Sequence, residues 1–162
     1  MATFGTTVHV DGGTEGFYTA YVVGQLYTLA EAGNVTSMSM WTAHGGAGNH
    51  LRMGIWDSAG NIVAQTEEGI VPSDDYYWVT LDISPGVDLA AGDYYLGFQC
   101  DADGQQFYRL TTGINMKYEA HTYGALESVG SWASDYGTKT ISIYATYTAG
   151  GGISVALTGV SG

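Results

Sequence analysis

The residues best suited to chemistry in this sequence are two carboxylates held on a glycine turn. Asp101 and Asp103 stand at alternate positions just before Gly104. Carboxylate oxygens on a tight turn are hard ligands of the kind that Ca²⁺ takes, and the run resembles the opening of a calcium-binding loop. No glutamate follows at the later position that an EF-hand requires, and ordinary turn chemistry explains the run equally well. Asp101 and Asp103 are therefore a candidate calcium site, and we expect no other cofactor.

Flat aromatic side chains offer a second kind of chemistry, because they stack on the apolar faces of sugar rings. The chain has four Trp and 13 Tyr residues. Some of them fall in loops or on strand faces opposite the expected core, and these form, with one nearby amide, a candidate glycan platform: Trp41, Trp56, Asn49 and Trp132. The alternative is packing, since Trp and Tyr commonly fill strand-rich cores and subunit contacts.

A third feature is an alternating apolar segment behind a run of glycines. Residues 149–162 begin with a glycine joint and continue with three apolar residues that alternate with small ones: Ile153, Val155 and Leu157. Such a segment suits the last strand of the same domain, the opening of a further domain, or a strand that pairs with a neighbouring subunit. We keep these three residues as a candidate assembly strand.

The other polar residues lack the spacing of a catalytic site. Four histidines are scattered along the chain: His9, His44, His50 and His121. The sequence has no His-Glu-x-x-His run and no Gly-x-Ser-x-Gly nucleophile elbow. The adjacent pairs Glu67-Glu68 and Asp74-Asp75 point apart on an extended chain, unlike the facing carboxylates of a glycosidase. We expect no catalytic residue and no enzyme.

The charge balance excludes further function classes. The 162 residues carry 16 acidic and 4 basic side chains, which gives a formal net charge of −12. So few cations cannot neutralise a phosphate track, and we expect no nucleic-acid binding. No apolar run approaches the ~20 residues of a membrane span, and the first residues lack the basic and apolar regions of a signal peptide. We expect neither membrane insertion nor a secretory signal peptide.

The elements that must position these residues are short strands. Turn signals recur every ~8–15 residues, and the alternating segments between them predict the following strands: Thr6–Val10, Phe17–Val23, Gln25–Leu29, Val35–Ala43, His50–Trp56, Ile62–Thr66, Tyr76–Ile83, Tyr94–Cys100, Gln106–Leu110 and Thr138–Thr148. No segment has a convincing helical stripe. The pattern predicts an all-β fold, an antiparallel β-sandwich (jelly-roll-like) of about 8–10 strands. Residues 1–148 form the sandwich domain, and the lone Cys100 is expected as a structural thiol, with intermolecular pairing as the alternative.

Two stretches carry a resemblance to known modules. Val35–Met40, followed by Leu51–Ala64, is similar to the jelly-roll modules of bacterial secreted proteins and phage virion proteins. Later strands of the pattern match as well, so that the resemblance covers most of residues 25–148. It implies an accessory role, such as an anchor, a carbohydrate-binding-like domain or a virion surface part. Residues 155–162 are similar to repeated Ig-like segments of phage structural proteins.

We therefore expect a non-catalytic domain for surface structure or adhesion. It would serve as a virion decoration or fibre or as an extracellular appendage subunit, outside the cell or on the virion. Its partners would be copies of itself or other surface proteins. The alternative function is a carbohydrate-binding module that recognises a glycan through exposed aromatic side chains. Fold similarity alone does not decide between these functions.

Overall fold

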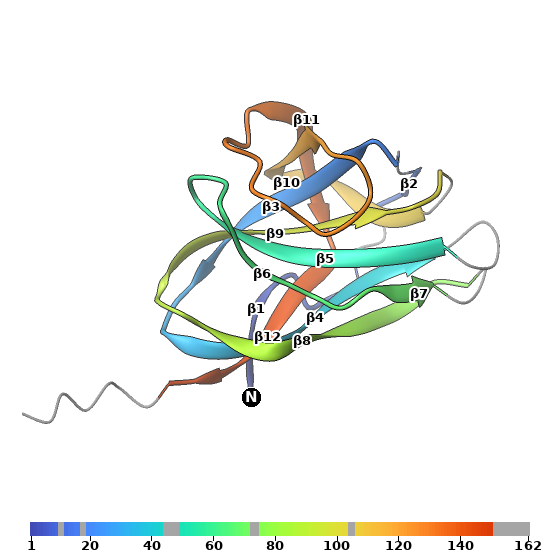
Figure 1. The fold of residues 1–162 in the computed structure, drawn as a ribbon. Helices are drawn as coiled ribbons and strands as arrows, with labels where there is room; N and C mark the ends of the chain where they lie inside the picture. Colours follow the sequence, from blue (N-terminus) through green and yellow to red (C-terminus); the bar gives the residue numbers. More distant parts are fainter. Residues whose placement is uncertain (10–11, 17–18, 44–48, 72–74, 104–105, 151–162) are drawn as a thin grey trace, which may run out of the picture.

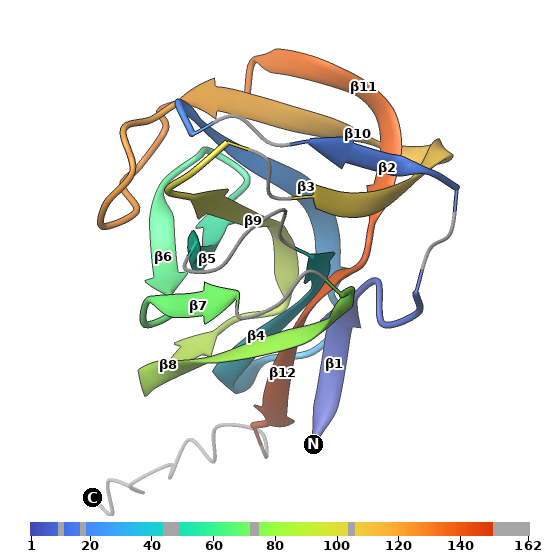
Figure 2. The ribbon, with the colours of Figure 1, turned by 90° about the vertical axis from the view of Figure 1, so that its right-hand side faces the viewer.

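The strands form two antiparallel sheets that pack face to face as a sandwich (Figures 1 and 2). The structure is a computed structural model, and it describes residues 1–9, 12–16, 19–43, 49–71, 75–103 and 106–150. All regular elements among these residues are strands. In the described part of the chain, nothing forms a helix long and apolar enough to cross a bilayer.

The first sheet, sheet A, contains four main strands in the spatial order β1 (Ala2–Gly5), β12 (Ile143–Ala149), β4 (Gly33–Ala43) and β8 (Tyr77–Leu89). Sheet B has the order β11 (Ser134–Ile141), β10 (Gln106–Ala120), β3 (Tyr21–Leu29), β9 (Gly92–Cys100) and β5 (Asn49–Asp57). The far edge of β5 pairs with β6 (Ile62–Gln65) and β7 (Gly69–Val71), while β2 (Thr14–Gly16) pairs with the start of β10. The all-β sandwich is thus confirmed, and it is compatible with a jelly-roll.

Two expected strands have different limits because the chain passes from one sheet to the other. The segment expected as one strand over Thr138–Thr148 is divided at Ser142, which separates β11 of sheet B from β12 of sheet A. Strand β10 begins beside β4 in sheet A and ends beside β3 in sheet B. Alternation along the sequence shows that a segment is extended, but it does not show which partner it has.

Two further expectations differ from the structure near glycines. Phe17–Val23 and Gln25–Leu29 were expected as two strands, yet β3 runs unbroken through Gly24. The first strand lies at Ala2–Gly5, whereas residues 6–9 of the expected strand Thr6–Val10 form none and Val10 lies outside the described residues. Gly5 ends it with a φ of +115°, and a Cβ there would collide with the backbone of β12. Only glycine adopts such a backbone readily.

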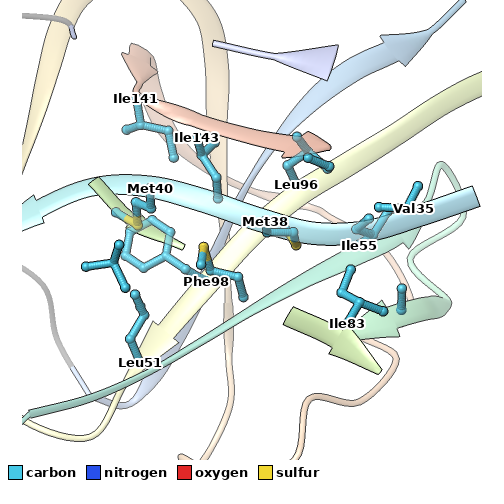
Figure 3. Close-up of a cluster of buried hydrophobic side chains, with 14 of the residues drawn as sticks. Val35, Met38, Met40, Leu51, Ile55, Ile83, Leu96, Phe98, Ile141 and Ile143 are labelled. Atoms are coloured by element: carbon cyan, nitrogen blue, oxygen red, sulfur yellow. The ribbon is translucent and has the colours of Figure 1, made fainter. Parts of the chain in front are cut away.

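The core lies between the two sheets. Inward side chains of β4, β5, β9 and β12 are fully buried, and Figure 3 shows side chains of both sheets pointing toward one another: Met38, Met40, Leu51, Ile55, Leu96, Phe98 and Ile143. Cys100 belongs to this core as a free thiol, as expected for a structural cysteine.

A second, smaller core lies on the outer face of sheet B. Three glycines stand in register on adjacent strands, because Gly24 pairs with Gly97 and Gly97 pairs with Gly54. The indole rings of Trp56 and Trp132 occupy the space above them. The connection between β10 and β11, orange in Figure 1, supplies Trp132 and Leu126 to this core and holds Trp56 through its Glu127 carbonyl. The glycines therefore form the floor of a site that two large rings fill.

Candidate functional site

The outer face of sheet A carries the candidate site. Side chains of a strand alternate between its two faces. In β4, Met38 and Met40 enter the core, so Ser39 and Trp41 point to the outer face. The register places Trp41 opposite Trp78 of β8. Outward side chains of the four neighbouring strands therefore stand side by side in rows across this face.

Three aromatic rings and a histidine meet at one end of this face. The Trp41 and Trp78 ring centroids are 5.7 Å apart with planes at 62°, and those of Trp78 and Tyr144 are 5.1 Å apart at 63°. The His9 ring lies 4.7 Å from that of Trp41. We call these four residues the aromatic cluster. Trp41, Trp78 and Tyr144 are half-buried, so each ring keeps an accessible part.

A small residue allows the rings to meet across β4. Ser39 lies between Tyr144 and Thr80 in the pairing of β12, β4 and β8. It is 1% exposed, and its hydroxyl is hydrogen-bonded to that of Thr80 at 2.8 Å. A larger side chain here would separate Trp78 from Tyr144. The serine thus sets the spacing of the aromatic cluster.

Hydroxyl groups and one carboxylate continue the face beyond the aromatic cluster. Thr3, Thr146, Ser37 and Asp82 stand side by side on β1, β12, β4 and β8. Thr3, Thr80 and Asp82 are exposed, while Ser37 and Thr146 are half-buried. We call Thr3, Ser37, Thr80, Asp82 and Thr146 the polar rows. They offer donors and acceptors beside an aromatic surface.

The face has an acidic character and lacks cations. The four strands β1, β4, β8 and β12 contain no Lys or Arg, and their charged residues are Asp82 and Asp88. Asp88 accepts a hydrogen bond from the Asn34 side chain at 2.8 Å. In the polar rows, Asp82 is therefore the sole formal charge.

Two of the expected platform residues lie elsewhere and are buried. Trp56 is 0% and Trp132 is 6% exposed, and their ring centroids are 5.2 Å apart in the small core outside sheet B. Trp56 Nε1 donates to the Glu127 carbonyl at 2.8 Å. The expectation that these rings offer a free face is wrong, because the β10–β11 connection brings Trp132 and Leu126 against Trp56 and Val22 in one buried cluster. Packing, the alternative interpretation, describes both residues.

The other two platform residues are separated. Trp41 lies in the aromatic cluster, as described above. Its Nε1 is buried and lacks a hydrogen-bond partner among the described residues. Asn49 begins β5 of sheet B, where its backbone pairs with Val71, so it does not belong to the strands that hold Trp41. Its side chain lies outside the described part.

The candidate calcium ligands have different partners. Asp101 accepts hydrogen bonds from the His50 backbone at 2.7 Å and pairs with the His50 ring at 2.5 Å. Exposed Asp103 accepts a hydrogen bond from the Thr19 backbone at 3.0 Å. No group of three His, Cys, Asp or Glu side chains that could hold a metal ion occurs among the described residues. Calcium binding at this turn stays a prediction.

His50 and Asp101 belong to a network of charges at the edge of sheet B. The hydrogen bond to Asp101 raises the pKa of His50. Burial alone would raise the pKa of Asp101, but the His50 hydrogen bonds lower it on balance. Close by, Glu68 pairs with Arg52 at 3.1 Å and accepts the Tyr123 hydroxyl at 2.8 Å. The charges compensate one another, which describes a structural network.

The glycan platform predicted from the sequence did not include Trp78, Tyr144 or His9. One signal was present, because alternation along Tyr77–Ile83 places Trp78, Thr80 and Asp82 on one face. No signal linked that face with Tyr144, since the link depends on strand pairing. The candidate assembly residues Ile153, Val155 and Leu157 lie outside the described residues. No model of a known protein family matches the chain, and no curated protein matches it either.

Proposed function

We propose that this chain is a non-catalytic surface domain that adheres to a glycan through the outer face of sheet A. The observation that carries the proposal is the aromatic cluster of half-buried rings beside the polar rows. Sugar rings have apolar faces of C–H groups that stack on aromatic rings, whose faces are electron-rich. Their hydroxyl groups suit the Ser and Thr hydroxyls and the carboxylate of the polar rows. Both halves of the face therefore fit one ligand class.

The arrangement of charge supports binding without cleavage. Glycoside hydrolysis uses two carboxyl groups, about 5 to 9.5 Å apart, on either side of the bond. The polar rows contain one carboxylate, Asp82. An adhesion role outside the cell or on a virion follows from the same proposal.

Substitutions in the aromatic cluster test this function. The protein is first screened on an array of immobilised glycans. For any glycan retained, Trp41→Ala and Trp78→Ala should each weaken binding about tenfold, which equals ~1.4 kcal/mol. Tyr21→Ala is the matched control, because Tyr21 is an exposed ring of sheet B, 5.3 Å from Tyr118. Retention of no glycan, or equal binding by all variants, would refute the proposal.

A second proposal, assembly of a virion or appendage, has its own observation. An apolar groove of about 470 Å³ lies where the described chain ends, between the β3–β4 and β8–β9 turns, and its lining includes Leu89, Ala149 and Gly150. Gly150, the last residue that the structure describes, lines this groove. We propose that Ile153, Val155 and Leu157 of a second copy occupy it. A chain shortened to residues 1–150 should then stay folded and lose self-association in light scattering, and unchanged assembly would contradict the proposal.

A further inference from the structure

The angles between the rings restrict what the aromatic cluster can bind. Trp41 and Trp78 meet at 62°, and Trp78 and Tyr144 meet at 63°. Rings inclined in this way share no common plane. The flat surface of a crystalline polysaccharide could therefore not lie against Trp78 and either of these two neighbours at once. A single glycan chain, whose successive sugars turn relative to one another, can contact inclined rings in succession.

The dimensions of the face exceed one sugar ring. Strands lie about 4.8 Å apart and rise about 3.3 Å per residue, so the four strands span about 14 Å and the step from Ser37 to Trp41 spans about 13 Å. The aromatic cluster occupies one end of this area and the polar rows occupy the other. A short stretch of an oligosaccharide would contact both.

The charges exclude acidic sugars. All four Lys and Arg side chains lie outside the four face strands β1, β4, β8 and β12: Arg52 is on β5, Arg109 and Lys117 are on β10, and Lys139 is on β11. Arg52 pairs with Glu68 at 3.1 Å, and Lys117 pairs with Asp135 at 2.6 Å. A carboxylated or sulfated glycan on sheet A would meet Asp82 and no Lys or Arg of the face strands. Like charges repel, and the net charge of −12 adds to the effect.

From these three observations we infer that the ligand is a single chain of an uncharged polysaccharide. It lies on the outer face of sheet A, with sugar faces against the aromatic cluster and hydroxyl groups on the polar rows. The inference rests on the proposed glycan-binding function and adds the class of ligand. Uncharged sugar hydroxyl groups can form hydrogen bonds with the hydroxyls of Ser37, Thr80 and Thr146, and this binding needs no Lys or Arg.

Binding to four kinds of probe tests the inference. Affinity electrophoresis is run with soluble neutral polysaccharides (a mixed-linkage β-glucan, a xylan and a galactomannan), with acidic polygalacturonate and hyaluronate, and with chitosan at high salt. Sedimentation with microcrystalline cellulose supplies the flat crystalline surface. We expect at least one neutral polymer to retard the protein, with retardation lost in Trp78→Ala and kept in Tyr21→Ala. The acidic polymers should not retard the protein in electrophoresis, and the protein should not sediment with the cellulose crystals.

The outcomes separate the ligand class from the proposed function. Binding of an acidic polymer or of cellulose crystals that Trp78→Ala abolishes would overturn the uncharged single chain and leave glycan binding intact. Tighter binding of chitosan than of neutral polymers, lost in Asp82→Asn, would replace the uncharged ligand with an amino sugar. Binding of no probe would overturn both. As a positive test of the charge argument, Asp82→Lys should bring polygalacturonate binding close to that of the neutral polymer.

Discussion

Trp56→Ala is expected to destabilise the fold rather than remove a ligand contact. The side chain is 0% exposed, packs edge-on against Trp132 at 5.2 Å and donates a hydrogen bond to the Glu127 carbonyl. Gly54 and Gly97 lie beneath the ring, where a Cβ would approach it to 2.9 Å. Removing the indole therefore opens a cavity that has glycines on its floor.

The size of the effect follows from this environment. Replacing a buried Trp by Ala costs about 3–5 kcal/mol, and the cost is higher where the surroundings cannot collapse. The glycines have no side chains that could move into the space, so we expect about 5 kcal/mol. The total free energy of unfolding of a domain is about 5–15 kcal/mol. The variant should be marginally folded.

Urea unfolding followed by circular dichroism measures the loss. With a slope of about 2 kcal/mol per molar urea, the midpoint should fall by about 2.5 M. Trp41→Ala is the control, because half-buried Trp41 should cost roughly 1–2 kcal/mol. A Trp56→Ala midpoint at or above that of Trp41→Ala would refute the buried placement. So would a stable Trp56→Ala variant that has lost glycan retention.

Three further predictions concern the glycine row, the ionic network and the thiol. Gly97→Ala should cost at least about 1–3 kcal/mol in urea unfolding, because the added Cβ collides with the Val23 carbonyl and Trp56; Gly16→Ala, with open space around it, should cost far less. The His50–Asp101 pair should contribute its full stability below pH 6.5, which is the ordinary pKa of histidine. This contribution should be lost as the pH rises through the raised pKa of His50. Because the Asp101 pKa is lowered, the same contribution should also fall in acid, below 3.8. Asp101→Asn should flatten both slopes of unfolding free energy against pH, and unchanged slopes would contradict the pairing. Cys100 is fully buried with a raised pKa, chiefly through burial, so it should react with a thiol reagent in denaturant and not in the native protein.

The sequence alone was sufficient for the class of fold and for most strand positions. Alternation and turn residues are local properties, and they predicted the extended segments around Met38, Leu51 and Leu96. The turn at residues 57–61, between the expected strands His50–Trp56 and Ile62–Thr66, is one example, because Asp57 accepts hydrogen bonds from the backbone of Ala59 and Asn61 within it. The sequence also showed that Trp41 opposes the core, since its neighbours Met40 and Met38 are apolar.

The tertiary structure decided which aromatic rings share a surface. Trp41, Trp56 and Trp132 look alike in the sequence, and exposure depends on what covers each ring. Trp56 and Trp132 are buried because the β10–β11 connection folds over a glycine row assembled from three strands. Trp41 instead joins Trp78 and Tyr144, which are 37 and 103 positions further along the chain, because β4 pairs with both β8 and β12. Strand pairing is a long-range property, so no local pattern could place the site.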